Sequence, residues 1–332
     1  MISTDATPLR QAVFVESPAR LHFGVLDLRG AFGRWFGGIG AAAPAPTLLL
    51  SARPADTLKV SGEDAVRAAD FARRFVVQHD VPGGAELCVH RALPAHAGLG
   101  SGTQLALAVA RALAELHMIE VDMPELARAM GRACRSAIGT WTFAAGGLVV
   151  EGGRRHARDR CGPLLMRMPF PRTWRCVVAV PNGVSSISGA DEEAAFTELP
   201  PPPVREAERV AHLVLMGLLP ALAEADLQTF GSALSEIQRL TGNWFASVQG
   251  GAFARGPSAE LVRRMAECGA SGAGQSSWGP AVYGIVDGED EGRRLADRAR
   301  EMLDGVGGSV YHGPFPSEGA RVWRESLCGS GS

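Results

Sequence analysis

Lysine is almost absent from this sequence. Of its 33 basic residues only Lys59 is a lysine, and the others are arginines. The formal net charge is -2, which gives no broad basic field, so nucleic acid is not expected as a partner. An excess of arginine is typical of a GC-rich genome. It also suits phosphate and carboxylate ligands, because a guanidinium group can donate two parallel hydrogen bonds to either of them.

The sequence also lacks paired cysteines and long apolar runs. Its six cysteines contain no CxxC pair, and their spacing fits neither a zinc site nor a disulfide framework, so we expect reduced thiols. The N-terminal segment 1–14 has no apolar core of the kind that signal peptides carry. The longest apolar stretch, residues 213–223, is too short to cross a bilayer. We therefore expect a cytoplasmic protein with no membrane segment.

The order of the expected elements indicates an α+β fold. β-branched and aromatic residues predict a first strand over residues 12–28, followed by a glycine-rich loop over 30–40. Apolar residues at helical spacing predict helices over 63–79 and 105–116, the second buried on most sides. Further strands are expected over 47–52, 56–60, 86–93, 146–153, 176–181, 281–286 and, as the last of the chain, 308–313.

The chain is long enough for two domains. At about 150 residues per domain, a chain of 332 residues predicts two units. Prolines punctuate the segment 163–171 and a new buried strand follows it, so the boundary is placed there. The prediction is an N-terminal domain over residues 1–168 and a C-terminal domain over residues 169–332. In the second half helices alternate with short strands, which is the pattern of a layered α+β domain.

One glycine-rich loop leads directly into a helix. Residues 96–108 read HAGLGSGTQLALA. Glycine leaves backbone N–H groups open to a ligand, and the helix dipole adds to their attraction for an anion, so this loop suits a phosphate group. Ser101 and Thr103 add hydroxyl donors. The same letters also suit a tight strand-to-helix turn capped by a serine, and they match neither GxxxxGK[ST] nor GxGxxG.

Three motifs, in order along the chain, resemble those of the GHMP kinase superfamily. The segment LPAHAGLGSGTQLALA at 93–108 is similar to its phosphate-binding motif, SPARLHFGVLDL at 17–28 to its opening strand motif, and ASGAGQSSWGPAVYGI at 270–285 to its C-terminal loop. The resemblance implies a two-domain α+β fold, with an N-terminal domain like ribosomal protein S5 and a ferredoxin-like C-terminal domain. It places the active site in the cleft between them.

Two positions depart from the kinase pattern. Gly102 replaces a loop serine that often binds magnesium in the kinases. The segment RSAIGTWTFAAGGLVVEGG at 135–153 has no acid before Glu151, where the kinases commonly place a catalytic aspartate. Phosphoryl transfer from ATP needs metal ligands and a positioned base or cationic clamp. Because the usual serine and aspartate are missing here, an ATP-dependent small-molecule kinase is only the second interpretation. A silent binding protein that kept the fold is the third, and three intact loops argue against it.

With these departures, the motifs resemble the β-ribofuranosylaminobenzene 5′-phosphate synthase family, which shares the fold but contains no kinases. The resemblance implies condensation of phosphoribosyl pyrophosphate with 4-aminobenzoate or 4-hydroxybenzoate in methanopterin biosynthesis. CO2 and pyrophosphate leave, and a C–C bond joins the ring to the sugar. Which benzoate is used stays open. The leaving pyrophosphate calls for arginines and a divalent ion, taken as Mg2+ with no ligands assigned. Base rates for oligomers favour a homodimer.

The chemistry of this reaction selects four candidate catalytic residues. Arg20 and Arg34 are expected to clamp anionic groups, although a solvated surface charge also explains each of them. His22 alternates with Arg20 along the expected strand, so both should face one side, where His22 would orient substrate or accept a proton unless it is a structural histidine. Asp27 would hold magnesium or contact the ribose hydroxyls, or else it is a turn residue ahead of Arg29.

Three loops supply the candidate substrate-binding residues. The first is expected to cradle a phosphate, the second to line an aromatic pocket, and the third to add polar donors beside a tryptophan wall. They are Gly98, Leu99, Gly100, Ser101, Gly102, Thr103 and Gln104 in the first loop, Ser136, Gly139 and Thr140 in the second, and Gly274, Gln275, Ser276, Ser277 and Trp278 in the third. Acidic residues at 191–193 are either helix N-terminal charges or metal ligands.

Overall fold

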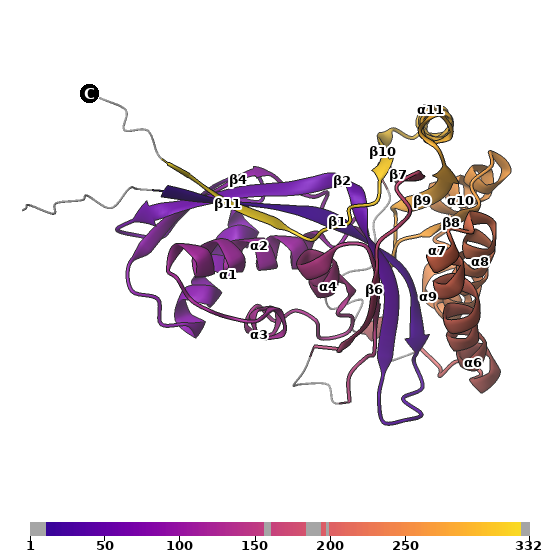
Figure 1. The fold of residues 1–332 in the computed structure, drawn as a ribbon, viewed down its shortest axis with the longest axis horizontal. Coiled ribbons are helices and arrows are strands. Elements are labelled where there is room, and N and C mark those ends of the chain that lie inside the picture. The colour runs from indigo at the N-terminus through magenta and orange to yellow at the C-terminus, as the bar shows by residue number, and fades with distance from the viewer. Residues whose placement is uncertain (1–10, 156–160, 184–193, 197–198, 327–332) are drawn as a thin grey trace, which may run out of the picture.

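Two β-sheets with helices packed on them make up the computed structural model of the protein (Figure 1). The structure describes residues 11–155, 161–183, 194–196 and 199–326, so the acidic run at 191–193 lies outside the described residues. Strands and helices are mixed in both halves, which confirms the α+β class expected from the sequence. Within the described residues, no helix is both long enough and apolar enough to span a membrane.

The larger sheet has seven described strands and is built around the first two. β1 (Gln11–Asp27) and β2 (Phe36–Ala55) form a long antiparallel pair. The order is β11-β1-β2-β4-β3, β5 also pairs with β2, and β6 pairs with β5. The pairing of β3 with β4 is parallel. The remaining strands are β3 (Lys59–Gly62), β4 (Gly84–Arg91), β5 (Leu148–Glu151), β6 (Leu164–Met168) and β11 (Arg321–Ser326).

Helices α1 to α4 lie on one side of this sheet (Figure 1). Their bounds are α1 (Ala65–Gln78), α2 (Ser101–Leu116), α3 (Met123–Ala129) and α4 (Ile138–Ala145). α2 packs against β1 and β2 as well as against the other three helices. Its alanine-rich and leucine-rich surface is buried on most sides, as the sequence predicts. The glycine loop therefore opens a helix whose position is fixed by the core.

The smaller sheet is antiparallel, in the order β10-β7-β9-β8. Its strands are β7 (Trp174–Pro181), β8 (Gly272–Gln275), β9 (Val282–Asp287) and β10 (Gly308–Pro314). α8, α10 and α11 pack on it. The helices of this half are α6 (Val204–Leu213), the π-helical turn Val214–Leu218, α7 (Leu219–Glu224), α8 (Leu227–Trp244), α9 (Ala246–Gln249), α10 (Pro257–Glu267) and α11 (Glu289–Leu303).

One hydrophobic cluster spans both halves, and a second, smaller cluster lies within the C-terminal half. The Phe170 ring contacts the rings of Trp174, Phe230 and Phe315, and the same cluster of buried residues continues into β1, β2 and α2. α8 also packs directly against β1, and the Gln238 amide of α8 donates a hydrogen bond to the carbonyl of Phe23 in β1. This shared packing fixes the residues of β1 relative to the second half of the chain.

Two expectations about the strands are wrong. Residues 36–40, expected in a loop, begin β2, and a Cβ at Gly40 would lie 2.3 Å from the carbonyl oxygen of Leu21. Glycine is therefore required by crowding inside the sheet rather than by a turn. Residues 308–314 are not the last strand, because β11 pairs with β1. The expected boundary at residue 168 falls between β6 and β7, where the chain changes sheet; as a domain boundary it stays a prediction.

Candidate active site

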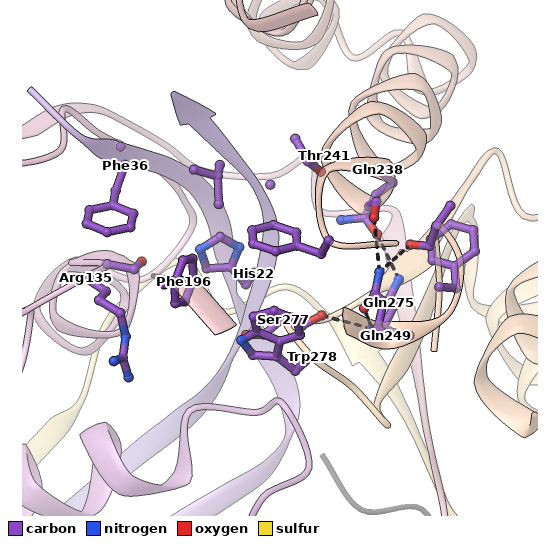
Figure 2. Close-up of a pocket in the computed structure, with 18 of the residues that line it drawn as sticks. His22, Phe36, Arg135, Phe196, Gln238, Thr241, Gln249, Gln275, Ser277 and Trp278 are labelled. Carbon is purple, nitrogen blue, oxygen red and sulfur yellow. Dashed lines mark hydrogen bonds between the residues drawn. The ribbon is translucent and has the colours of Figure 1, made fainter. Parts of the chain in front are cut away.

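A pocket opens where β1 meets α8 and the C-terminal glycine loop (Figure 2). It holds about 740 Å³ of empty space, part of it open to solvent. Arg20 and His22 both line it, which confirms that they face one side of β1. None of the lining residues in the described ranges is an aspartate or glutamate. The larger lining side chains are Arg20, His22, Phe36, Arg135, Ser136, Phe196, Gln238, Thr241, Phe245, Gln249, Gln275, Ser277 and Trp278.

The first glycine loop packs closely on two other motifs. Gly98 and Gly100 have φ values of +77° and +76°, a region that L side chains rarely adopt. A Cβ at Gly98 would lie 2.2 Å from the carbonyl oxygen of Ser276, and one at Gly100 would lie 2.7 Å from Cγ of Arg20. Because both glycines lack a Cβ, the loop backbone can lie directly against Ser276 and Arg20, which a residue with a side chain would prevent.

The three sequence motifs converge on the carbonyl oxygen of Gly98. Nη1 of Arg20 donates to it at 2.8 Å, and Oγ of Ser276 donates to it at 2.6 Å. The same Ser276 hydroxyl accepts a hydrogen bond from the backbone N–H of His22 at 3.0 Å. Ser276 is fully buried, so it joins the loops instead of facing a ligand.

The first turn of α2 is arranged to attract an anion. The helix begins at Ser101 after the cap residue Gly100, which offers no side-chain hydrogen bond. N–H groups at the start of a helix have no intrahelical acceptor, and the positive end of the helix dipole lies there. Phosphate binding by this loop stays a prediction from the sequence, and the geometry suits it.

His22 is a neutral imidazole in this site. Burial, together with the neighbouring charge of Arg20, lowers the pKa of His22 to about 3. At neutral pH one ring nitrogen is therefore a hydrogen-bond donor and the other an acceptor. The side chain lines the pocket, so it can accept a hydrogen bond from a hydroxyl or amine of a ligand.

Aromatic rings form one wall of the pocket. The ring of Phe196 lies edge-on to Phe36, Phe245 and Trp278, at centroid distances of 5.6, 5.7 and 5.8 Å. Phe245 and Trp278 contact each other at 4.9 Å. The guanidinium group of Arg135 lies 5.7 Å from the centre of the Phe196 ring. Such a wall with an arginine at its edge suits a planar, apolar ligand that carries a negative group.

Three glutamines fix the α8 side of the pocket. The backbone N–H of Gln275 donates to Oε1 of Gln238 at 2.9 Å. Nε2 of Gln275 donates to Oε1 of Gln249 at 3.3 Å and to the carbonyl of Ser277 at 3.0 Å (Figure 2). This network ties the C-terminal loop to α8 and α9, and so holds Ser277 at the pocket.

The other two candidate catalytic residues do not line the pocket. Asp27 is the last residue of β1, and its Oδ1 accepts the backbone N–H of Arg29 at 2.6 Å, so its carboxylate stabilises the turn that follows the strand. Nη1 of Arg34 donates to the carbonyls of Gly152 and Gly153 at 3.2 and 2.9 Å. In this arrangement Arg34 anchors a loop to the end of β5 and does not reach the pocket as an anion clamp.

Several candidate binding residues lie in the interior. The fully buried Gln104 accepts a hydrogen bond from the Ser17 hydroxyl at 2.5 Å and donates one to the carbonyl of Gly139 at 2.9 Å. Both ends of its amide are thus engaged, and it ties β1 to α4 in place of a substrate contact. Buried positions of the same kind are Leu99, Gly139, Thr140 and Gly274.

Sequence reasoning missed the wall that α8 and α9 supply. Its members recur every three or four residues along the end of α8, the residue that follows it and α9, and polar residues within this otherwise apolar pattern were the available signal. They are Gln238, Thr241, Phe245 and Gln249. Phe36 was missed because its segment was expected to be a loop. Arg135 adjoins the expected Ser136 but gave no signal of its own.

Glu151 is a buried carboxyl group next to the loop that carries Arg135 and Ser136. Its Oε2 accepts the backbone N–H of Gly153 at 2.7 Å, and its Oε1 accepts that of Ala137 at 3.3 Å. Burial raises the pKa of Glu151 to about 7, although these two donors and nearby arginine charges oppose the shift. The side chain thus holds the loop in place and titrates near neutral pH.

Comparisons with known proteins agree with this fold. The sequence pattern described as GHMP kinases N terminal domain matches residues 64–145, and that described as GHMP kinases C terminal matches residues 218–305. A homoserine kinase from Cytophaga hutchinsonii superposes with a TM-score of 0.68 at 16% identity, over 97% of this chain and 100% of that chain. At this identity the likeness shows the fold alone, and it confirms the two-domain GHMP kinase fold.

Two archaeal proteins are more similar in sequence. Beta-ribofuranosylphenol 5′-phosphate synthase from Methanothermobacter thermautotrophicus is 34% identical over 301 residues, which cover 83% of this chain and 89% of that protein. The protein of the same name from Archaeoglobus fulgidus is 35% identical over 287 residues, covering 82% and 87%. This similarity runs through both halves of the fold. The chain therefore belongs to the beta-ribofuranosylphenol 5′-phosphate synthase family.

Proposed function

We propose that this protein condenses phosphoribosyl pyrophosphate with a para-substituted benzoate. The reaction releases CO2 and pyrophosphate, leaves a C-riboside 5′-phosphate, and serves methanopterin biosynthesis. One observation carries the proposal: the pocket joins an aromatic wall, two arginines and a neutral imidazole, with no carboxylate among its described lining residues. A planar aromatic acid and a phosphorylated sugar are ligands that such a lining recognises. Membership of the family supports the same reaction.

The names of the relatives favour one of the two benzoates. They specify a ribofuranosylphenol, and a phenol ring is what remains when 4-hydroxybenzoate loses its carboxylate. 4-Aminobenzoate would leave an aminobenzene instead. We therefore take 4-hydroxybenzoate as the ring substrate. A neutral His22 can accept the hydrogen bond of its para hydroxyl, which a protonated imidazole could not do.

The first part of the reaction separates charge at the sugar. The bond between C1 and the diphosphate oxygen breaks, and its electron pair leaves with pyrophosphate. C1 gains oxocarbenium character, as in glycoside chemistry. Arg20 and Arg135 line the pocket, and fixed positive groups there stabilise the charge on the departing diphosphate.

The second part forms the carbon–carbon bond. The ring carbon that carries the carboxylate attacks C1, and the para hydroxyl donates electron density to the ring. The bond to the carboxylate carbon then breaks, CO2 leaves, and the electron pair of that bond restores the aromatic ring. His22 accepts a hydrogen bond from the para hydroxyl during the attack, and the hydroxyl proton stays on the oxygen of the phenol product. The wall of Phe196, Phe245 and Trp278 orients the ring and keeps water from C1, where water would hydrolyse the sugar.

Mg2+ belongs to this proposal through the substrate. Within the part of the chain that the structure describes, no group of three His, Cys, Asp or Glu side chains could hold a metal ion. Mg2+ often binds through substrate phosphates and keeps several waters. The ion would therefore arrive with the diphosphate, and none of the steps above depends on a cage of protein ligands.

An ATP-dependent kinase of the same fold is the competing function. A kinase requires a base that accepts the proton of the attacking alcohol, or a positive group that stabilises the alkoxide. The pocket has no carboxylate among its described lining residues, and Glu151 is engaged with two backbone N–H groups. These features favour the condensation over phosphoryl transfer.

Release of labelled CO2 tests the proposed function. The protein and Mg2+ are incubated with carboxyl-labelled 4-hydroxybenzoate or 4-aminobenzoate, together with phosphoribosyl pyrophosphate, with ATP, or with neither. We expect release only with phosphoribosyl pyrophosphate, and faster release from 4-hydroxybenzoate. No release from either acid by folded protein contradicts the proposal. Phosphoryl transfer from ATP would identify a kinase, and binding without turnover would identify a silent relative.

We also propose that the protein works as a homodimer in the cytoplasm. The described cysteines Cys88, Cys134, Cys161, Cys176 and Cys268 are free thiols, which supports a reducing compartment. Two-fold symmetric dimers are the commonest oligomers, which supports the dimer. Sedimentation equilibrium of the purified protein checks the oligomeric state, and a monomer mass at all concentrations contradicts it.

A further inference from the structure

A second group of arginines lies on the α1 side of the glycine loop. Arg67 and Arg74 belong to α1, and Arg132 follows α3. The guanidinium group of Arg132 packs on the Phe71 ring of α1, 4.8 Å from its centre. It also covers the first turn of α2, because a Cβ built at Gly102 would lie 3.5 Å from its Nη1 and 3.7 Å from its Nη2. The cluster therefore adjoins the loop, outside the ring pocket.

Arg132 carries a charge that the described residues do not balance. Its buried Nε has no hydrogen-bond partner, and none of the described carboxylates pairs with the side chain. Arg67 is paired with Asp64, and Arg74 donates to a backbone carbonyl at 2.9 Å. Burial lowers the pKa of Arg132, and the charges of Arg67, Arg74 and Arg135 lower it further. Several like charges thus surround one partly buried cation.

The position of Arg132 adds to this imbalance. The start of a helix carries partial positive charge and stabilises anions, so a guanidinium group there is repelled. α2 has no acidic residue in its first turn and no side-chain cap. An anion placed between Arg132 and α2 would satisfy both, because guanidinium groups bind phosphate through paired, charge-assisted hydrogen bonds.

We propose that Arg132 binds the 5′-phosphate of the sugar substrate, in an anion subsite separate from the ring pocket. The inference rests on the proposed function, whose sugar substrate carries phosphate at both ends of the ribose. C1 and its diphosphate must lie beside the ring, where Arg20 and Arg135 line the pocket. The opposite end of the ribose then extends along the glycine loop, from Arg20 at Gly100 to Arg132 at Gly102.

Calorimetric titration of two simple ligands tests the assignment. Ribose 5-phosphate and inorganic pyrophosphate are titrated into the wild type, Arg132→Gln, Arg132→Lys and the control Arg128→Gln. Arg128 lies one turn earlier, is exposed, and lies 3.9 Å from Glu125. We expect Arg132→Gln to weaken ribose 5-phosphate by about tenfold or more, Arg132→Lys to weaken it less, and pyrophosphate to be little affected. Unchanged ribose 5-phosphate binding, or loss of pyrophosphate binding alone, overturns the assignment.

Thermal unfolding separates a binding role from a structural one. If Arg132 serves a ligand, Arg132→Gln should melt at or above the wild-type temperature without anions, and ribose 5-phosphate should stabilise the wild type more than the variant. The proposal is contradicted if Arg132→Gln melts below the wild type both with and without ribose 5-phosphate, and if the ligand raises the melting temperature of both proteins equally. The labelled-CO2 assay remains independent of this test. Binding that depends on Arg132 without CO2 release would support the subsite and contradict the proposed reaction. CO2 release without Arg132-dependent binding of ribose 5-phosphate would contradict only the subsite.

Discussion

The hydroxyl of Ser276 accepts a hydrogen bond from the backbone N–H of His22 at 3.0 Å, across a separation of 254 residues. The same hydroxyl donates to the carbonyl of Gly98 at 2.6 Å. One side chain of the C-terminal glycine loop therefore holds both the strand that carries His22 and the loop that opens α2. The pocket and the expected phosphate loop form one unit through this contact.

Removal of this hydroxyl should loosen the site. Ser276→Ala leaves the buried N–H of His22 without its acceptor, so the free energy of unfolding should fall by about 1–3 kcal/mol. The KM for both substrates should rise because the loops lose their junction. Urea unfolding and steady-state kinetics measure these effects. In the control Ser232→Ala, an exposed helical serine loses a bond to the Gln228 carbonyl of its own helix, and stability should change by less than about 0.5 kcal/mol. Equal stability of the two variants contradicts the junction.

His22 should make folding sensitive to acid. Its pKa falls from the ordinary 6.5 to about 3 in the folded protein. Between these values the unfolded chain binds a proton that the folded protein does not. The contribution of His22 to stability should therefore be full above pH 6.5 and decline as the pH falls toward 3, by up to about 1.4 kcal/mol per pH unit. His22→Gln should reduce this slope in urea midpoints. A variant with the wild-type slope would show that His22 does not titrate this way.

Glu151 should act with the opposite sign. Burial raises its pKa from 4.5 to about 7, so between these values the folded protein keeps a proton that the unfolded chain releases. Its contribution is present below pH 4.5 and is lost as the pH rises through 7. Glu151→Gln stays neutral and should abolish this decline. The effects of His22 and Glu151 offset each other between pH 4.5 and 6.5, so each variant must be compared with the wild type at every pH. A decline in Glu151→Gln equal to that of the wild type refutes the assignment.

The aromatic wall should bind the ring and not the sugar. Phe245→Leu removes the edge-on ring contacts with Trp278 at 4.9 Å and with Phe196 at 5.7 Å while keeping an apolar side chain. The KM for 4-hydroxybenzoate should rise about threefold to tenfold, which is the range expected when a bound ring loses one aromatic contact. The KM for phosphoribosyl pyrophosphate should change by less than about twofold. Equal increases in both constants would indicate a general loss of structure in place of a ring contact.

The motif loops could be predicted from the sequence because their glycines have a local cause. Gly98 and Gly100 require positive φ and close approach, and such positions keep a recognisable spacing. The buried helix α2 could be predicted from its apolar periodicity. At Gly40 the same pattern led to a wrong prediction of a loop. Gly40 lies inside β2, and it lacks a side chain because Leu21 of β1 and Ile138 of α4 leave no room for one.

The features that the sequence did not predict depend on contacts between residues far apart in the chain. β11 is mostly exposed, and its pairing with β1 depends on a partner some 300 residues away, so no local pattern announces it as part of the larger sheet. Arg34 and Gln104 were expected at the substrate because of their motifs, whereas the fold engages them with backbone groups and a buried serine. The wall from α8 appears only when that helix packs on β1. Sequence thus located the loops, and tertiary packing decided which of their side chains face the pocket.

The central claim is a carbon–carbon bond between the ring and the sugar. Protein is incubated with 4-hydroxybenzoate carrying ¹³C at the carboxylate-bearing ring carbon and phosphoribosyl pyrophosphate carrying ¹³C at C1, and the product is examined by carbon NMR. We expect one-bond coupling between the two labelled carbons and no carboxylate signal in the product. A product that retains its carboxylate, or whose C1 is bonded to oxygen or nitrogen, would contradict it.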